Sequence, residues 1–138
     1  MSAPKPEPEG AICIVEPDHA VRDGLVSFIG VYNQHVCGFS DSGDLRQAWP
    51  DVHATGVLCA ARLPDAGAVD LYQWLLDTDA RVPFAMTVSK HQHREIAFAL
   101  DAGIFHILHK PLLPGTALVR FIDHVQATAM NKRPRQPT

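Results

Sequence analysis

The chain has 138 residues, 46% hydrophobic and 20% charged, which is the composition of one soluble globular domain. Its formal net charge is −3, and basic residues cluster only near the C-terminus, so the composition argues against direct binding to nucleic acid. The first ten residues hold no apolar run, which argues against a signal peptide or membrane anchor there. Cys13, Cys37 and Cys59 each lie in an apolar segment, as buried thiols do in a reducing compartment, so we expect a cytoplasmic protein without membrane contact.

Composition also divides the chain into three parts. Residues 1–10 are rich in Pro and Glu and predict a disordered leader, whereas residues 130–138 form a basic polar tail. Residues 11–129 remain as a single domain. The N-terminal Met and the short tail favour a complete chain.

Short apolar runs alternate with segments of helical length. The runs cover residues 11–15, 35–39, 56–60, 83–88 and 104–108. Most are nearly continuous rather than alternating, which is typical of parallel strands covered on both faces. The pattern therefore predicts an α/β fold of the (βα)5 type, with a doubly wound, five-stranded parallel sheet.

Five helices are expected between and after these strands. Asp18 is a candidate N-cap of the first, Gly30 ends it, and Gly103 is placed to cap the fourth in a left-handed conformation. The predicted helical segments are 18–30, 42–49 before Pro50, 69–77, 92–102 and a segment after Pro114. Leu118, Ile122 and Val125 share one face of the last helix.

The fourth helix carries an aromatic residue on its polar side. At 100° per residue, Ile96, Ala99 and Leu100 face the core, whereas Phe98 falls among charged residues. Phe98 is therefore a candidate contact residue. A single exposed Phe without a role is the alternative interpretation.

Three separated motifs resemble those of response-regulator receiver domains, the CheY-like family. They are "CIVEPDHAVRDGL" at 13–25, "RLPDAGAVDL" at 62–71 and "DAGIFHILHKPL" at 101–112. Their order and spacing match the family over residues 11–125, and the resemblance is greatest to receivers that precede helix-turn-helix output domains. It implies the flavodoxin/CheY-like fold.

The resemblance also implies a phosphorylation site, most of which this chain lacks. Family members carry an acidic pair after the first strand, an acceptor Asp, a Thr or Ser, an aromatic reporter and a Lys before a proline that is commonly cis. The matching positions here are Glu16 and Pro17, Ala60, Val88, Ile107, and Lys110 followed by Pro111. Only Glu16 and the Lys-Pro pair agree with the family.

The consequence of these substitutions is chemical. A methyl group forms no acyl phosphate, and Mg²⁺ needs carboxylate oxygens that Ala60 and Pro17 lack. Shifting the alignment by one residue places Cys59 or Ala61 at the acceptor position and restores no carboxylate. We therefore expect no Mg²⁺ or other cofactor and no enzymatic activity. Asp65 is a less favoured surrogate acceptor, since loop Asp residues usually shape turns.

These expectations define a degenerate receiver, or pseudo-receiver, that acts without phosphorylation as a protein-interaction module in bacterial two-component signalling or transcriptional control. The fourth helix, fifth strand and fifth helix form the face through which receivers commonly meet partners or dimerise. A protein partner or a homodimer is thus expected on that face. Its candidate contact residues are Phe98, His106, Leu112 and Phe121.

Several alternatives stay open at this stage. Lys110 either pairs with Glu16 or builds an anion pocket, with the ion pair favoured. His91, His93 and His109, together with His106, offer a metal or pH-sensing site, although no carboxylate or Cys completes a ligand pattern. Phosphotransfer through an unorthodox acceptor is a further rival.

Overall fold

A central parallel sheet organises the structure, a computed structural model that describes residues 10–32, 34–112 and 115–132. Its strand order is β2-β1-β3-β4-β5, and every neighbouring pair is parallel. The strands are β1 (Ala11–Val15), β2 (Val36–Phe39), β3 (Ala54–Ala60), β4 (Phe84–Val88) and β5 (His106–His109). The predicted fold class and strand number are confirmed.

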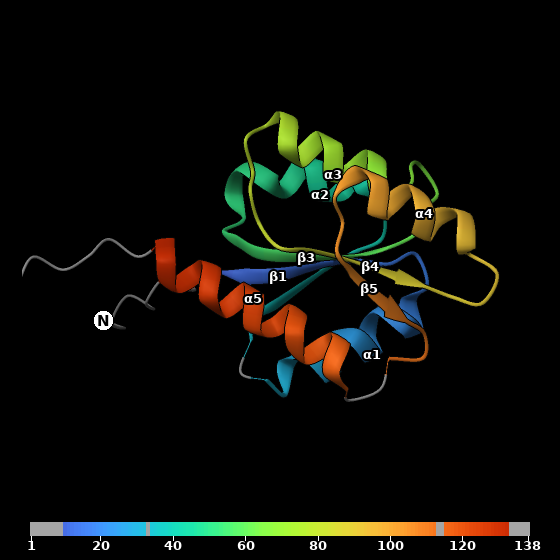
Figure 1. Ribbon diagram of the computed structural model, residues 1–138. Coiled ribbons are helices and arrows are strands. Elements are labelled where there is room, and N and C mark those ends of the chain that lie inside the picture. The colour runs from blue at the N-terminus through green and yellow to red at the C-terminus, as the bar shows by residue number, and fades with distance from the viewer. Residues whose placement is uncertain (1–9, 33, 113–114, 133–138) are drawn as a thin grey trace, which may run out of the picture.

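Helices cover both faces of the sheet (Figure 1). One face carries α2 (Ser42–Ala48), α3 (Ala68–Asp77) and α4 (His93–Ala102), and the other carries α1 (His19–Gly30) and α5 (Thr116–Lys132). A short 3₁₀ helix, η1 (Trp49–Asp51), follows α2. No helix among the described residues is long and apolar enough to cross a bilayer.

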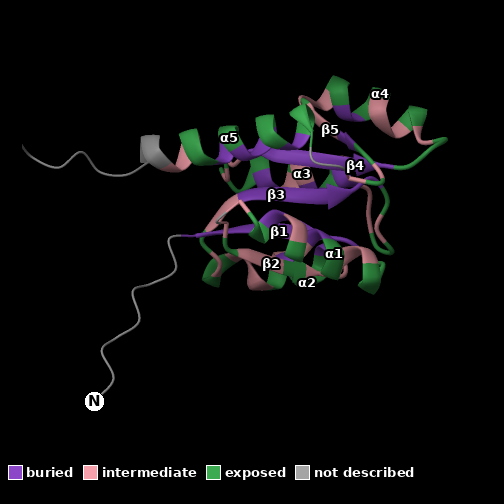
Figure 2. Cartoon of the chain, turned by 90° about the horizontal axis from the view of Figure 1, so that it is seen from below, coloured by how far each residue is buried: buried purple, intermediate pink, exposed green. Residues whose placement is uncertain are grey.

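Each strand contributes side chains to two separate hydrophobic cores, because alternate side chains point to opposite faces of the sheet. Cys13, Val57 and Met86 pack under α2, α3 and α4, whereas Ile12, Leu58 and Ala85 pack under α1 and α5. The central strands are therefore buried along most of their length (Figure 2). This double burial explains why the apolar runs are continuous in the sequence.

Several element ends behave as predicted. The Asp18 carboxylate accepts a hydrogen bond from the Val21 N–H at 3.1 Å, and Gly103 ends α4 at φ +103°. Other boundaries differ by one to three residues. Pro50 lies inside η1 after α2 has ended at Ala48, since its ring tolerates the first turn of a helix. α5 extends to Lys132, beyond the predicted domain end at residue 129.

Two predicted positions are wrong. Phe121, a predicted contact residue, has 0% exposure because it lies on the inner side of α5 beside Leu118 and Val125. Leu100, a predicted core residue, is 51% exposed. α4 buries only Ala99 fully, so the stripe it presents to the core is narrower than the predicted arc.

Candidate functional site

The residues that match the receiver motif gather where β1, β3, β4 and β5 end. Glu16 follows β1, Ala60 ends β3, and Val88 ends β4. Lys110 follows β5, and its backbone N–H donates to the Val88 carbonyl at 2.8 Å. Parallel strands place their carboxyl ends at one edge of the sheet, which is where open α/β folds bind ligands.

The acceptor position offers no oxygen nucleophile. Ala60 is 6% exposed and Ala61 is 4% exposed, so two methyl groups occupy this end of β3. The neighbouring Cys59 thiol is fully buried and its Sγ lies 3.2 Å from the Ala60 carbonyl oxygen. Burial raises the pKa of Cys59, and the nearby Glu16 and Asp65 raise it further. Cys59 is thus held as a neutral thiol and does not replace the missing carboxylate.

Lys110 is engaged by Glu16. Its ammonium forms an ion pair with Glu16 Oε1, and the side chains are 29% and 3% exposed respectively. Glu16 Oε2 accepts a hydrogen bond from the Asp18 N–H at 3.1 Å, so both carboxylate oxygens are used. Arg22 Nη1 donates to the Glu16 carbonyl at 2.8 Å. The predicted Glu16–Lys110 pair is present, and the Lys110–Pro111 peptide is cis.

Asp65 stabilises the start of α2. It accepts hydrogen bonds from the Ser42 N–H at 3.1 Å, the Ser42 hydroxyl at 3.0 Å and the Gly43 N–H at 2.9 Å. Desolvation acts to raise the pKa of Asp65, but these hydrogen bonds outweigh it and the pKa is lowered. The carboxylate is therefore committed to helix capping. The sequence predicted that Asp65 shapes a turn in its own loop. It did not predict the hydrogen bond with Gly43, which lies 22 residues away.

The remaining switch positions hold apolar side chains. Val88 has 0% exposure, and Ile107 is half-buried against the core under α2, α3 and α4. Pro17 is exposed between Glu16 and the Asp18 cap. Neither Val88 nor Ile107 carries a polar group that could form a hydrogen bond with a charged group at the end of β3.

The predicted contact residues do not form one surface. Phe98 is 67% exposed and lines a hollow of about 260 Å³ between α3 and α4. His106 is half-buried on β5, and its Nε2 lies 2.9 Å from Nδ1 of His124 on α5. Leu112 lies elsewhere, beside Lys110, and Phe121 is buried as described above.

The sequence did not predict two exposed residues near β5 and α5. Phe105 is 79% exposed, and His124 is exposed on α5. Phe105 belongs to the apolar run 104–108, whose composition predicts a buried strand. β5 begins only at His106, so Ile104 is buried and Phe105 faces outward. No local signal separates Phe105 from its neighbours, because this run is apolar at four of its five positions.

The other predicted histidines are dispersed over the surface. His91, His93 and His109 are all exposed, and His91 has φ +75°. Across residues 10–32, 34–112 and 115–132, no three His, Cys, Asp or Glu side chains are placed to hold a metal ion.

An apolar cavity of about 650 Å³ lies next to Lys110. Its walls come from α1, from the loop after β4 and from the segment after β5. It is lined by Val21, Gly24, Leu25, Phe28, Ser89, Lys90, Lys110, Pro111 and Leu112. Sequence reasoning did not identify this cavity, because its walls come from segments far apart in the chain.

Comparison with known proteins agrees with this geometry. The family model described as "Response regulator receiver domain" matches residues 12–122. The transcriptional regulatory protein GltR of Pseudomonas aeruginosa is 25% identical over 112 residues, covering 80% of this chain and 46% of GltR. This chain therefore corresponds to less than half of that relative.

Solved structures show the same fold. The N-terminal domain of an uncharacterized protein from Wolinella succinogenes superposes with a TM-score of 0.77 at 19% identity, covering 89% of this chain and 98% of that one. The signal receiver domain of an HD domain-containing protein from Pseudomonas fluorescens Pf-5 gives 0.79 at 15% identity, with 96% and 98% covered. With the family match over residues 12–122, these findings identify the chain as a member of the response regulator receiver domain family, the receiver module of two-component signalling.

Proposed function

We propose that this receiver domain works without phosphorylation, as a protein-interaction module of two-component signalling. The observation that carries the proposal is the methyl group of Ala60 at the acceptor position. Asp65 caps α2 and Cys59 is a buried neutral thiol, so neither neighbour supplies a phosphoryl acceptor. Of the expected Mg²⁺ ligands, Pro17 and Ala60 supply no carboxylate, and the Glu16 carboxylate is already used by Lys110 and the Asp18 N–H, so we propose that the site binds no Mg²⁺.

The proposal includes a fixed conformation. In an ordinary receiver, the charge of the phosphoryl group shifts an equilibrium between two surfaces. Here Lys110 is neutralised by Glu16, and Val88 and Ile107 are held by packing. Activity then depends on a partner or on the amount of protein. Because the relative GltR is named a transcriptional regulatory protein, we propose transcriptional control in the bacterial cytoplasm as the setting.

Incubation with Mg²⁺ and acetyl phosphate tests the absence of phosphotransfer. We expect the intact mass of the wild-type protein to stay unchanged. The matched control is the double variant Pro17→Asp with Ala60→Asp, which returns the acidic residues and is expected to gain a phosphoryl group. A stable phosphoryl adduct on the wild-type chain would overturn the proposal.

The interaction surface is tested separately. We propose that α4, β5 and α5 meet a protein partner or a second copy, through Phe98 and His106 among the predicted residues. Light scattering after size-exclusion chromatography measures self-association, and affinity capture from the source cell compares wild type with Phe98→Arg. The control is Gln47→Arg, an exposed change on α2, which lies outside the proposed face. A partner or dimer retained equally by both variants would exclude Phe98 from the interface.

A second candidate function is ligand sensing at the altered phosphorylation site. The cavity of about 650 Å³ beside Lys110 favours it, since cavities of this size hold small molecules. Thermal shift measurements with small anions and divalent cations test this alternative. Stabilisation that is lost in Lys110→Met would move ligand sensing ahead of the interaction proposal. No stabilisation by any of them would remove it.

A further inference from the structure

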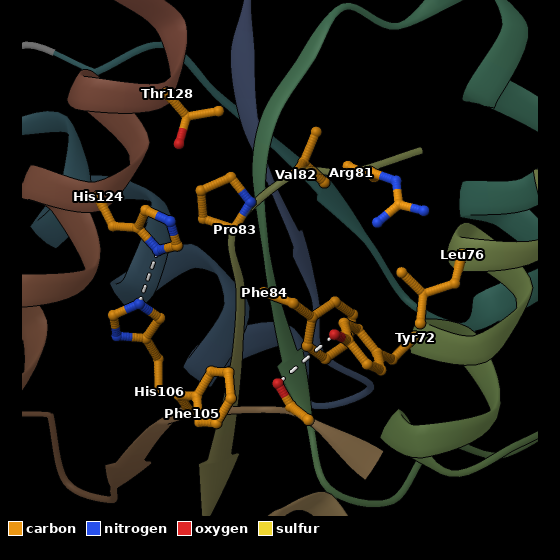
Figure 3. Close-up of a pocket in the computed structure, with 11 residues that line it drawn as sticks. Tyr72, Leu76, Arg81, Val82, Pro83, Phe84, Phe105, His106, His124 and Thr128 are labelled. Carbon is orange, nitrogen blue, oxygen red and sulfur yellow. Dashed lines mark hydrogen bonds between the residues drawn. The ribbon is translucent and has the colours of Figure 1, made fainter. Parts of the chain in front are cut away.

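A hollow of about 250 Å³ lies at the opposite pole from Lys110, where β4 and β5 begin (Figure 3). We call it the amino-end hollow. It is built by α3, the segment entering β4, the turn between α4 and β5, and the second half of α5. Its lining residues are Tyr72, Leu76, Arg81, Val82, Pro83, Phe84, Gly103, Phe105, His106, His124 and Thr128.

Aromatic rings supply much of its wall. The rings of Tyr72 and Phe84 meet at 61° with centroids 5.2 Å apart. The third ring, Phe105, is 79% exposed although it directly follows the buried Ile104. Figure 3 shows these three rings around the hollow. An exposed aromatic beside an aromatic wall is a surface that a flat apolar group would cover.

The polar side chains of the hollow are basic or carry a hydroxyl group. Arg81 comes from one side, and the His106–His124 pair comes from the other (Figure 3). The Arg81 Nε also lies 3.4 Å from Asp79 Oδ1, and Asp79 is not part of the lining. Thr128 adds a hydroxyl. None of the eleven lining residues is acidic, so the hollow favours an anionic group over a cationic one.

His106 and His124 contribute a pair of imidazole rings to the wall of the hollow. Burial and the neighbouring His124 lower the pKa of His106. With both rings neutral and one proton shared across the 2.9 Å contact, one outer ring nitrogen of the pair is an N–H donor and the other is an acceptor, so the pair offers one donor to a bound carboxylate.

We propose that the amino-end hollow binds a small aromatic carboxylate. The ring would rest against Tyr72, Phe84 and Phe105, with the carboxylate toward Arg81 or the imidazoles. The volume lies below the roughly 300–1,000 Å³ of sites for drug-sized ligands, which limits the occupant to about one ring with one or two substituents. This site is independent of the altered phosphorylation site, and through His106 it adjoins the proposed partner face.

Nuclear magnetic resonance titration with benzoate tests the proposal. We expect saturable shifts of the backbone amides of Phe84, Phe105 and His106, with a dissociation constant on the order of 1 mM for so small a ligand. Acetate keeps the charge without the ring, and benzylamine keeps the ring with the opposite charge. Neither should give saturable shifts at these amides.

Variants locate the site and separate it from general anion binding. Phe105→Ala and Arg81→Gln should each weaken benzoate binding by about tenfold, because they remove ring contact and the charged donor. Both side chains are largely exposed, so these variants should remain folded. The matched control, Arg120→Gln on the exposed side of α5, should bind as wild type.

Three results would overturn the assignment. They are no saturable shift with benzoate, equal shifts with benzylamine, and wild-type affinity in both hollow variants. Failure here leaves the phosphorylation-independent function untouched, because that proposal depends on Ala60 and the acetyl phosphate assay.

Discussion

Lys110 and Glu16 form the ion pair at the carboxyl ends of the strands. Glu16 is 3% exposed, so neutralising its side chain leaves the partly buried Lys110 ammonium beside an amide instead of a carboxylate. We expect Glu16→Gln to lower the free energy of unfolding by roughly 1–3 kcal/mol, less than for a fully buried pair because Lys110 is 29% exposed. Urea denaturation with a constant m-value measures this effect.

The control for that change is Asp23→Asn, which breaks the exposed contact between His19 and Asp23 on α1. Exposed pairs contribute about 0–1 kcal/mol, so this variant should stay close to wild type. Equal losses of unfolding free energy in Glu16→Gln and Asp23→Asn would show that the Glu16–Lys110 pair stabilises the fold no more than an exposed pair does.

The lowered pKa of His106 predicts that the fold loses stability in acid. Burial, followed by the proximity of His124, lowers its pKa below the ordinary value of 6.5. Above about pH 6.5 the imidazole is neutral in both the folded and the unfolded chain, so no stability is lost there. As the pH falls from 6.5 toward the lowered folded-state pKa, the unfolded chain takes up the proton first and unfolding becomes easier.

We therefore expect the urea midpoint of the wild-type protein to fall between about pH 7 and pH 5, and to fall less in His106→Gln. The comparison variant is His93→Gln at an exposed position on α4. If His106→Gln reproduces the wild-type pH profile, the β5–α5 histidine pair is not the source of the sensitivity.

At the level of elements, the contact of β3 with α5 depends on a residue without a side chain. A Cβ built on Gly56 would lie 2.7 Å from Val125 Cγ2 and 3.4 Å from Phe121 Cζ. Both neighbours are buried, so they have little room to move. We expect Gly56→Ala to destabilise the fold by about 1–3 kcal/mol in thermal or urea unfolding.

Gly24 provides the matched control for Gly56. It lies within α1, and an added Cβ would meet no atom within 4 Å. Gly24→Ala should stabilise the protein by up to about 1 kcal/mol, since alanine favours a helix interior. A neutral Gly56→Ala would mean that α5 shifts to make room and that its packing on β3 is loose.

The elements themselves were largely predictable, because a strand covered on both faces must be apolar at nearly every position. The first strand, the Asp18 cap and the Gly103 cap follow from local chemistry. Predictions failed where tertiary packing decides. Leu100 is exposed because only a narrow side of α4 contacts the core. Phe105 is exposed and lies before β5, which begins at His106.

The candidate site shows the same division. The absence of an acceptor at Ala60 and the pairing of Glu16 with Lys110 could be read from the motif positions. Asp65 caps α2 through Gly43, which is 22 positions away in the sequence. His106 contacts His124, which is 18 positions away. No local pattern encodes such contacts, because they depend on how the loops and helices pack.

At the scale of the whole molecule, the substitutions separate two properties that a receiver normally couples. Under the proposed function, Pro17 and Ala60 remove the means of acquiring a phosphoryl charge, whereas Val88 and Ile107 remove the side chains expected to respond to it. Restoring only the first pair, in Pro17→Asp with Ala60→Asp, should return Mg²⁺ binding and acetyl phosphate labelling. We expect little change at α4 and β5, because Val88 and Ile107 are packed into the core and offer no hydroxyl or aromatic group.

Adding Val88→Thr and Ile107→Tyr to that double variant should couple phosphorylation at the end of β3 to the surface formed by α4 and β5. Amide shifts on phosphorylation would then spread from the ends of β1 and β3 to α4 and β5, whereas in the double variant they stay near the ends of β1 and β3. The reason is that a ligand shifts a conformation only if it interacts differently with the two states, and a hydroxyl and a mobile ring provide that difference. Shifts of equal extent in the two variants would show that the response of the surface does not depend on residues 88 and 107.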